Sequence, residues 1–489
     1  MMTTIQFKDP TLLRQQGFIN GEWCNAENGQ TEPVSNPATG ENIATVPNMG
    51  TSETRHAILA AQAAQPLWRA RAAVERSRIL RKWFELMMAN QEDLALLMTC
   101  EQGKPLAEAR GEIAYAASFI EWFAEEAKRV YGDVIPAPQN DKRIIVTKEP
   151  IGVCAAITPW NFPTAMITRK AGPALAAGCA MILKPDMRTP LSALALVELA
   201  NRAGIPKGIF SVVTGDAVAI GMEMTSNPIV RKISFTGSTG VGSKLMAQSA
   251  PSIKKLSLEL GGNAPFIVFD DADIDAAVQG ALASKYRNAG QTCVCTNRFL
   301  VQDSVYDEFS TKLANAVASL KVGNGLEDGV TQGPLIDEAA VKKVELLIDD
   351  AEKKGAKILT GGKRHALGKT YFEPTIMTEV TTDMRMAKEE IFGPVAPLFR
   401  FKDEQDAIQM ANDTEFGLAA YFYARDMSRV WRVSEALEYG MVGVNTGMIS
   451  NEVAPFGGMK SSGLGREGSK YGIEDYLEIK YVCMGITSA

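Results

Sequence analysis

Two cysteines, Cys293 and Cys295, lie close together in a polar stretch at residues 288–297, where a reactive thiol could meet a ligand. A cysteine is most often a small, buried and unreactive hydrophobe. Here the neighbours include Gln291 and Thr292, which make a poor core but suit the wall of a polar pocket. Because a thiolate is a strong nucleophile, Cys293 is a candidate for covalent catalysis.

A nucleophilic cysteine needs a base or a positive field. The chain has only two histidines, His56 and His365, and neither lies in a sequence that indicates a site, although a Cys-His pair is not excluded. A carboxylate is the better candidate for the base. Residues 255–260 (KLSLEL) alternate strictly, so Glu259 and the leucines face opposite ways, and two glycines follow. We expect Glu259 to be the base; the alternative is a solvated glutamate on an edge strand.

The elements expected around these residues would hold them at the ends of regular structure. Helical spacing over 274–286 and a short strand at 299–301 place Cys293 on a connection. Upstream, apolar strands alternate with helices, which is typical of a parallel sheet covered on both faces, with a nucleotide site at the carboxyl ends of the strands. The expected strands are 152–157, 180–184 and 210–213, and the expected helices between them are 165–177 and 191–203.

Two residues lie where such a nucleotide site is expected. Lys184 follows one strand, and Ser238 lies in the glycine loop 237–242 after another. Free amides between a strand and a helix can bind phosphate. The loop is not G-x-G-x-x-G, however, so a glycine turn without a ligand is an equal alternative on this evidence alone.

Length and composition exclude several classes of protein. With 489 residues, the chain is long enough for two or three cores, and 46% hydrophobic with 22% charged residues is typical of a globular enzyme. A net charge of −6 gives no overall basic surface for nucleic acid or a membrane. No apolar run has the length of a leader or a spanning helix, and the seven cysteines are scattered. We therefore expect a cytoplasmic protein.

Five motifs together resemble the NAD(P)-dependent aldehyde dehydrogenase superfamily, in family order over about residues 18–481. They are TPWNFP at 158–163, FTGST at 235–239, LELGG at 258–262, GQTC at 290–293 and EEIFGP at 389–394. Within the superfamily the chain looks most like the bacterial succinate-semialdehyde dehydrogenases. That finer resemblance is carried by MITRK at 166–170, GQTCVC at 290–295 and GLGREGSKYG at 463–472.

The resemblance implies an α/β fold with three parts. Residues 1–127 and 148–258 would form a Rossmann-like cofactor domain, and 259–458 a second α/β domain that carries the catalytic loop. Residues 128–147 and 459–489 would form a β-ribbon oligomerisation element, whose last strand, at 476–482, pairs with the ribbon at 131–147 or with another subunit. The expected assembly is a homodimer or homotetramer.

The resemblance also implies a reaction. Cys293 would add to an aldehyde carbon, and the resulting thiohemiacetal would lose hydride to nicotinamide and leave a thioester. The Asn161 amide and the Cys293 backbone N–H would stabilise the oxyanion. Glu259 would activate the water that hydrolyses the thioester, with a pKa raised by its apolar surroundings.

The expected cofactor residues follow the family motifs: Thr158, Pro159, Trp160, Lys184, Met187, Arg188, Gly237, Ser238, Glu390 and Phe392. NAD-preferring relatives commonly carry a glutamate three residues after the lysine, which repels a 2′-phosphate. Here that position is Met187, and the cation Arg188 follows. We therefore favour NADP, with NAD as the alternative because Met187 could crowd the phosphate. No metal site is expected.

Substrate choice would depend on Arg169, Arg287 and Ser450, which match positions that bind the substrate's distal carboxylate in the resembling subfamily. Arginine presents a planar fork suited to that group, whereas a single arginine is otherwise most often part of a surface ion pair. The expected reaction converts succinate semialdehyde to succinate. The alternatives are another carboxylate-bearing aldehyde, such as glutarate semialdehyde, and a catalytically retired binding protein.

Cys295 lies two residues from the expected nucleophile. A disulfide between Cys293 and Cys295 would require a bent loop and would be strained and readily reduced. We hypothesise that this disulfide reversibly inactivates the enzyme; the alternative is a spectator thiol.

Overall fold

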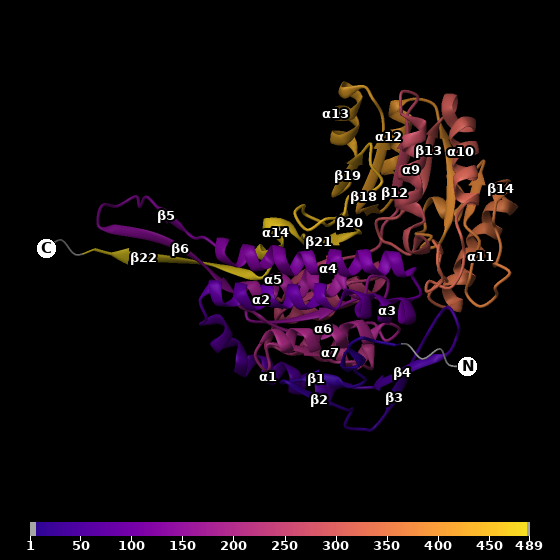
Figure 1. The fold of residues 1–489 in the computed structure, drawn as a ribbon. Helices are drawn as coiled ribbons and strands as arrows, with labels where there is room; N and C mark the ends of the chain where they lie inside the picture. Colours follow the sequence, from indigo (N-terminus) through magenta and orange to yellow (C-terminus); the bar gives the residue numbers. More distant parts are fainter. Residues whose placement is uncertain (1–5, 487–489) are drawn as a thin grey trace.

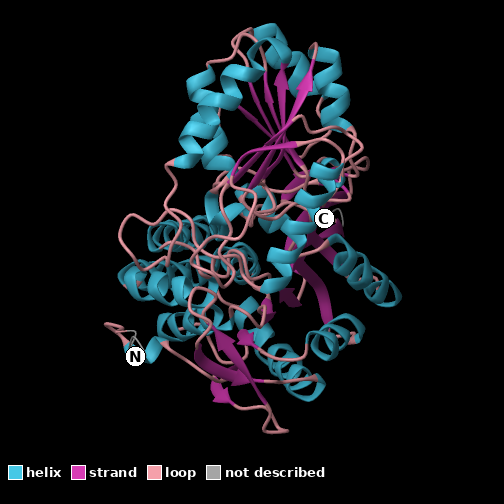
Figure 2. Ribbon diagram, turned by 90° about the vertical axis from the view of Figure 1, so that its right-hand side faces the viewer, coloured by secondary structure: helices cyan, strands magenta, loops and turns pink. Residues whose placement is uncertain are grey.

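Two separate β-sheets organise the computed structural model, which describes residues 6–486 (Figures 1 and 2). In the first sheet, the five central strands are parallel and the outer ones antiparallel. The strand order is β2 (Glu22–Cys24), β1 (Gly17–Ile19), β9 (Phe210–Val212), β8 (Ala180–Lys184), β7 (Val153–Ile157), β10 (Val230–Thr236), β11 (Lys255–Glu259) and β21 (Gly463–Leu464).

Helices cover both faces of this sheet, as the apolar strands predict. On one face, α5 (Ala165–Ala177) and α6 (Pro190–Ala203) pack on the strands, with α2 (Ala73–Ala89), α3 (Gln91–Gln102) and α4 (Leu106–Glu126) outside them. On the other face lie α1 (Thr51–Arg69), α7 (Ala217–Ser226) and α8 (Thr239–Ser249).

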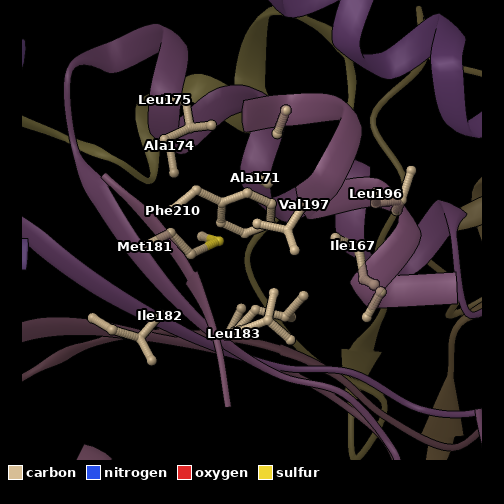
Figure 3. Packing of buried hydrophobic residues seen from close by; sticks show 14 of the residues in the cluster. Ile167, Ala171, Ala174, Leu175, Met181, Ile182, Leu183, Leu196, Val197 and Phe210 are labelled. Carbon is tan, nitrogen blue, oxygen red and sulfur yellow. The ribbon is translucent and has the colours of Figure 1, made fainter. Parts of the chain in front are cut away.

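The core between α5, α6 and the sheet is wholly apolar. Figure 3 shows Ala171, Ala174 and Leu175 of α5 packed with Met181 of β8 and Phe210 of β9. Both helices end at a glycine in the left-handed conformation, at φ 99° and φ 98°, which is the usual C-terminal signal of a helix. The predicted helix 165–177 and strand 180–184 are confirmed, and α5 runs back to β8 so that Lys184 ends a buried strand.

The second sheet forms the upper lobe in Figure 1 and is parallel except for β14. Its strand order is β14 (Lys357–Thr360), β15 (Thr375–Thr378), β16 (Val395–Phe401), β13 (Thr296–Gln302), β12 (Ala264–Val268), β18 (Ala419–Tyr423) and β19 (Met441–Val444). Alternate side chains of β12 enter two different cores, because helices cover both faces. These helices are α9 (Ile274–Lys285) and α10 (Tyr306–Ala318) on one face, and α11 (Glu338–Lys353), α12 (Glu404–Asn412) and α13 (Met427–Ala436) on the other.

A three-stranded ribbon projects from the body of the molecule, at the left of Figure 1. It consists of β22 (Leu477–Gly485), β6 (Lys142–Pro150) and β5 (Asp133–Ile135), with β6 in the centre. The terminal strand therefore pairs within its own chain, from Leu477 opposite Pro150 to Gly485 opposite Lys142. Its side chains are largely exposed, including Ile479 at 72% and Tyr481 at 61%.

The remaining short elements join these parts. They are the hairpin β3 (Thr31–Ser35) and β4 (Asn42–Pro47), the pair β17 (Phe416–Gly417) and β20 (Met459–Lys460), helix α14 (Ser469–Glu474), and the 3-10 turns Pro10–Leu12, Ala127–Arg129, Ala250–Ser252, Arg287–Gly290, Asp303–Val305 and Arg385–Ala387. Within residues 6–486, no helix has both the length and the apolar character needed to cross a membrane.

Candidate active site

The loop that carries Cys293 connects α9 to β13 and has a tightly specified backbone. Asn288, Ala289 and Gly290 are consecutive left-handed residues, with φ of 52°, 53° and 74°. A Cβ on Gly290 would lie 2.2 Å from the Gly393 carbonyl oxygen, so only glycine fits there. These three left-handed residues turn the chain sharply after α9. They thereby fix the direction in which the chain runs on to Cys293.

Gln291 ties this loop to the rest of the second lobe. Its side chain donates to the Asn288 carbonyl at 3.1 Å and accepts from the Ile336 N–H at 2.9 Å, and the Cys295 N–H donates to the Thr292 carbonyl at 2.9 Å. These buried bonds restrain the backbone on both sides of Cys293, as a positioned nucleophile requires.

Cys293 is half-buried and lies among charges of both signs. Burial raises the pKa of its thiol to about 12; Arg169, and to a smaller extent Arg287, act in the opposite direction, while Glu390 and Glu259 raise the pKa further. The thiol is therefore protonated at neutral pH in this structure, and its activation requires a base.

Glu259 lies at the end of β11 and is only 3% exposed. Both neighbours of β11 in the sheet, β10 and β21, are present, so the alternative of a solvated glutamate on an edge strand is wrong. Burial, and then the charge of Glu467, raises the pKa of Glu259 well above its ordinary value. Its Oε2 is buried without a hydrogen-bond partner among the described residues, so one lone-pair face is available to a water or a proton.

Glu467 is a site residue that the sequence did not single out. Its carboxylate pairs with Lys170, whose ammonium also donates to Thr236 Oγ1 at 2.7 Å, and with Arg169 Nε at 2.7 Å. Burial opposes the charge of Glu467, but Lys170 and Arg169 hold its pKa below the ordinary value. The sequence did contain one signal for such a partner. Two adjacent cations lie in the otherwise apolar segment 165–177, and buried charges must be paired.

Arg169 is thus already paired in this structure. Its guanidinium stacks 3.8 Å from the Phe456 ring centre and contacts Glu467, and its Nη2 is buried without a hydrogen-bond partner in residues 6–486. Arg169 does not line the cavity that contains the other two residues of the expected carboxylate clamp.

Those two residues, Arg287 and Ser450, do share a cavity, of about 260 Å³. The Arg287 guanidinium lies 5.4 Å from the Phe162 ring centre. The cavity is also lined by Tyr115, Phe162, Met448, Lys104, Glu108 and Glu112. Within residues 6–486, Arg287 forms no ion pair, and its buried Nε has no hydrogen-bond partner. Tyr115 and Phe162 were not identified from sequence because no local pattern distinguishes them from core aromatics.

Asn161 lies between this cavity and the next. Its Nδ2 donates to the Gln291 carbonyl at 3.0 Å, which brings the amide beside the Cys293 loop, and its own carbonyl accepts from Lys104 Nζ at 2.8 Å. Lys104 pairs with Glu112, a buried carboxylate that also accepts from the first backbone amides of α5. This anchoring was not predicted, since it joins three distant segments.

A second cavity, of about 250 Å³, contains Cys293 and most of the residues expected to bind the cofactor. Trp160 and Phe392 pack edge-on at 5.6 Å, and Glu390 accepts from the Gly262 N–H at 3.1 Å. Burial raises the pKa of Glu390 to about 7. The expected residues on its wall are Pro159, Trp160, Asn161, Gly237, Ser238, Glu390 and Phe392.

The remaining expected cofactor residues lie at the ends of β7, β8 and β10. The Thr158 N–H donates to the Lys184 carbonyl at 3.1 Å, and the hydroxyl of Thr158 is buried without a partner within the described residues. Burial lowers the pKa of Lys184. Ser238 is the residue before α8, and its side chain makes no capping bond, so its hydroxyl and the first helical amides remain available.

Met187 and Arg188 lie beside a third cavity, of about 450 Å³. The Met187 sulfur accepts from the Gly215 N–H at 2.9 Å, which holds this side chain against the sheet domain. The cation Arg188 that follows Met187 pairs with both Asp186 and Asp337 at 2.9 Å.

Cys295 is buried, and neither Cys295 nor the half-buried Cys293 forms a disulfide in this structure. Its thiol donates to the Lys285 carbonyl at 3.0 Å, at the end of α9. The hypothesis of a disulfide between the two stays a prediction, and in this structure the Cys295 thiol is engaged by the helix end. In residues 6–486, no group of three or more His, Cys, Asp or Glu side chains could hold a metal ion.

Comparisons with known proteins show what this chain is similar to. The model of the aldehyde dehydrogenase family matches residues 23–482. A glutarate-semialdehyde dehydrogenase of Pseudomonas aeruginosa is 70% identical, over 98% of this chain and 100% of the relative. A succinate-semialdehyde dehydrogenase [NADP(+)] of Escherichia coli is 69% identical, over 99% of this chain and 100% of the relative. The crystal structure of a succinate-semialdehyde dehydrogenase from Burkholderia pseudomallei superimposes with a TM-score of 0.98 at 69% identity, covering 98% of this chain and 100% of that one.

Proposed function

Because the chain belongs to the aldehyde dehydrogenase family, we propose that it oxidises succinate semialdehyde to succinate. The observation that supports this choice is the cavity of Arg287 and Ser450, where an arginine without an ion-pair partner in residues 6–486 lies near the Cys293 loop. Arg287 is half-buried, and arginine binds a carboxylate with two parallel hydrogen bonds. An aldehyde with a distal carboxylate supplies that anion.

The reaction follows from the residues around Cys293. Glu259 takes the thiol proton as the Cys293 sulfur adds to the aldehyde carbon, and it releases that proton to solvent before the second step. The aldehyde oxygen gains negative charge. The second N–H of the Asn161 amide and the Cys293 backbone N–H stabilise that oxygen. After oxidation, Glu259 takes a proton from the water that attacks the thioester carbon, and the Cys293 thiolate leaves with the acid as product.

Burial and nearby charges would control the protonation of Glu259. Glu467, held by Lys170 and Arg169, raises the pKa of Glu259 by its negative charge. Glu259 therefore ionises only above its ordinary pKa, and its proton affinity is high enough to deprotonate water or a thiol in the transition state. We assign Glu259 as the general base on this ground.

The residues of the second cavity fit a nicotinamide dinucleotide, which supplies the hydride acceptor when bound. Glu390 would bind the ribose hydroxyls on the nicotinamide side, beside Phe392 and Trp160, and Ser238 with the α8 amides would bind pyrophosphate. Lys184 and the orphaned Thr158 hydroxyl would contact the adenosine side. Exposed Val218 and Val241 on the packed helices α7 and α8 would offer an apolar face to adenine.

We favour NADP as the cofactor. Met187 replaces the carboxylate that would repel a 2′-phosphate, and Arg188 follows it. The Escherichia coli relative is named for NADP(+). The alternative is NAD.

The second candidate substrate is glutarate semialdehyde. A relative that is 70% identical is named for it, as close as the one named for succinate semialdehyde. The two aldehydes differ by one methylene, which an apolar pocket distinguishes by only about 1–3 kcal/mol. The shared feature, a carboxylate at the far end of a short chain, is the part of the proposal that Arg287 supports.

We also propose a homo-oligomer, a dimer or tetramer, that assembles through the ribbon of β5, β6 and β22. This ribbon projects away from the body, and Ile479, Tyr481 and Val134 expose apolar surface on it. Soluble monomers rarely expose such a run, which indicates a protein contact.

A cytoplasmic setting is supported by the scattered cysteines, which are all free.

The proposal is tested by the formation of reduced cofactor with three aldehydes. We expect kcat/KM for succinate semialdehyde and glutarate semialdehyde to exceed that for butyraldehyde, which has four carbons and no carboxylate. Equal kcat/KM for butyraldehyde would refute the carboxylate preference and leave only the family assignment. The same assay with NADP and NAD at matched concentrations gives the cofactor preference.

A further inference from the structure

The hydrogen bonds of Arg188 occupy every nitrogen of its guanidinium. Nε and Nη2 donate to the two oxygens of Asp186, and Nη1 donates to Asp337 Oδ2, all at 2.9 Å. A guanidinium has five N–H groups, so two remain. The guanidinium carbon also lies 5.1 Å from the ring centre of Trp160, a residue that lines the cofactor cavity.

Charges of both signs surround this point. Lys184 and Arg188 contribute two positive charges, and Asp186 and Asp337 two negative ones. A 2′-phosphate carries a charge of about −1.5 to −2 at neutral pH. Such a group gains little from Arg188 while both carboxylates stay in contact, because they screen the cation and repel the phosphate.

The two carboxylates are not equally easy to displace. Asp186 binds Arg188 through both oxygens, also accepts from the Arg188 backbone N–H at 2.9 Å, and its side chain is 24% exposed. Asp337 makes a single contact, is 37% exposed, and belongs to the other lobe, where its second oxygen caps α11 by accepting from the Ala340 N–H at 2.9 Å. Of the two carboxylates, Asp337 is therefore the one that a ligand can displace more easily from Arg188.

Helix α11 connects this ion pair to the cofactor. Ala340 and Lys343, on the first turns of α11, line the cavity that contains Cys293 and Glu390. Asp337, just before the helix, lines the neighbouring cavity together with Met187 and Arg188. The contact between Arg188 and Asp337 thus joins the two lobes at the place where the adenosine ribose would lie next to Met187.

We propose that Asp337 is a cofactor-specificity residue: it occupies Arg188 in the free enzyme, and the 2′-phosphate of NADP must replace it. This inference rests on the proposed use of NADP. Asp337 weakens NADP binding and leaves NAD binding unchanged, because NAD has no group that needs Arg188. The preference for NADP is consequently smaller than the sequence of Met187 and Arg188 alone indicates.

The test is calorimetric binding of NADP and of NAD to the full-length protein and its variants, with no substrate present. Asp337→Asn removes the charge and keeps a capping oxygen for α11, since asparagine caps as well as aspartate. We expect it to lower the Kd for NADP about two- to fivefold, the effect of losing one exposed ion pair, and to leave the Kd for NAD unchanged. Asp403→Asn, which alters the equivalent cap of α12 at a distance from Arg188, is the matched control and should change neither.

Arg188→Gln distinguishes two ways in which Asp337 could weaken NADP binding: by occupying Arg188, or by repelling the 2′-phosphate at a distance. It should raise the Kd for NADP about tenfold or more and spare NAD. In that background, Asp337→Asn should no longer tighten NADP binding, because there is no cation left to release. If Asp337→Asn tightens NADP equally with and without Arg188, or tightens NAD as much as NADP, the proposed competition is refuted while NADP remains the cofactor. If Arg188→Gln leaves NADP binding unchanged and the native protein binds NAD more tightly, both the NADP proposal and this inference fail.

Discussion

Replacing Arg287 by glutamine should remove most of the preference for a carboxylate-bearing aldehyde. Arg287 forms no ion pair within residues 6–486, so the change breaks no protein salt bridge, and the lost interaction is the one with substrate. Hydrogen bonds to charged groups contribute about 1.5–3 kcal/mol. At about 1.4 kcal/mol per factor of ten, kcat/KM for succinate semialdehyde should fall roughly 10- to 150-fold.

The matched measurement is kcat/KM for butyraldehyde with the same variant. Of the groups named as acting on the pKa of Cys293, Arg287 has the smallest effect. Its loss should therefore change kcat/KM for the uncharged butyraldehyde by less than about threefold. Arg287→Lys should fall in between, because lysine keeps the charge and loses the planar fork. The assay is the initial rate of cofactor reduction at substrate concentrations below KM.

Arg169→Gln is the contrasting variant. Arg169 pairs with Glu467 and favours the thiolate of Cys293, so its loss should reduce kcat for charged and uncharged aldehydes alike.

An equal fall for both substrates in Arg287→Gln would show that Arg287 only supports the loop. The assignment of the anion site would then be wrong.

Three further predictions concern the base, the second thiol and the ribbon. Glu259 has a raised folded-state pKa, so its stabilising effect is complete below its ordinary pKa and is lost as pH rises through the folded value. Glu259→Gln should therefore gain thermal stability relative to native protein as pH rises above the ordinary pKa of 4.5. A stability difference that does not change with pH would contradict the raised pKa. Cys295→Ala should stay active and lose the part of peroxide inactivation that dithiothreitol reverses; unchanged reversal would refute the disulfide. Tyr481→Glu on β22 should lower the assembled mass in light scattering, and an unchanged mass would exclude the ribbon as the contact.

The sequence predicted the elements whose signal is local. The alternation of apolar strands and helices over 152–213 corresponds to β7, α5, β8, α6 and β9, and the strict alternation at 255–260 placed Glu259 at a strand end facing away from the leucines. These patterns depend only on which neighbours along the chain are apolar. The sequence left open whether the terminal strand pairs with the ribbon of its own chain or with another subunit. In the structure, β22 pairs with β6 of the same chain.

The unpredicted parts of the site are contacts between distant segments. Arg169 and Glu467 are almost 300 positions apart in the chain, as are Lys170 and Glu467, and no periodicity relates them. The sequence placed Arg169 with Arg287 because both matched a motif, whereas the structure gives Arg169 a carboxylate partner of its own. The same holds for Arg188, whose charge was read from the sequence without Asp337, which approaches from the other lobe.

The charge balance around Cys293 explains why a base is needed even though two arginines lie nearby. Arg169 is shared with Glu467, and Arg287, in this proposal, binds the substrate carboxylate, so neither cation is left to stabilise a thiolate once substrate is bound. The negative charges of Glu390 and Glu259 both raise the pKa of the Cys293 thiol. Proton removal by Glu259 at the moment of attack avoids this accumulation, because one negative charge disappears as another forms. A carboxylate-bearing substrate therefore makes the reaction depend more on Glu259 than an uncharged aldehyde would.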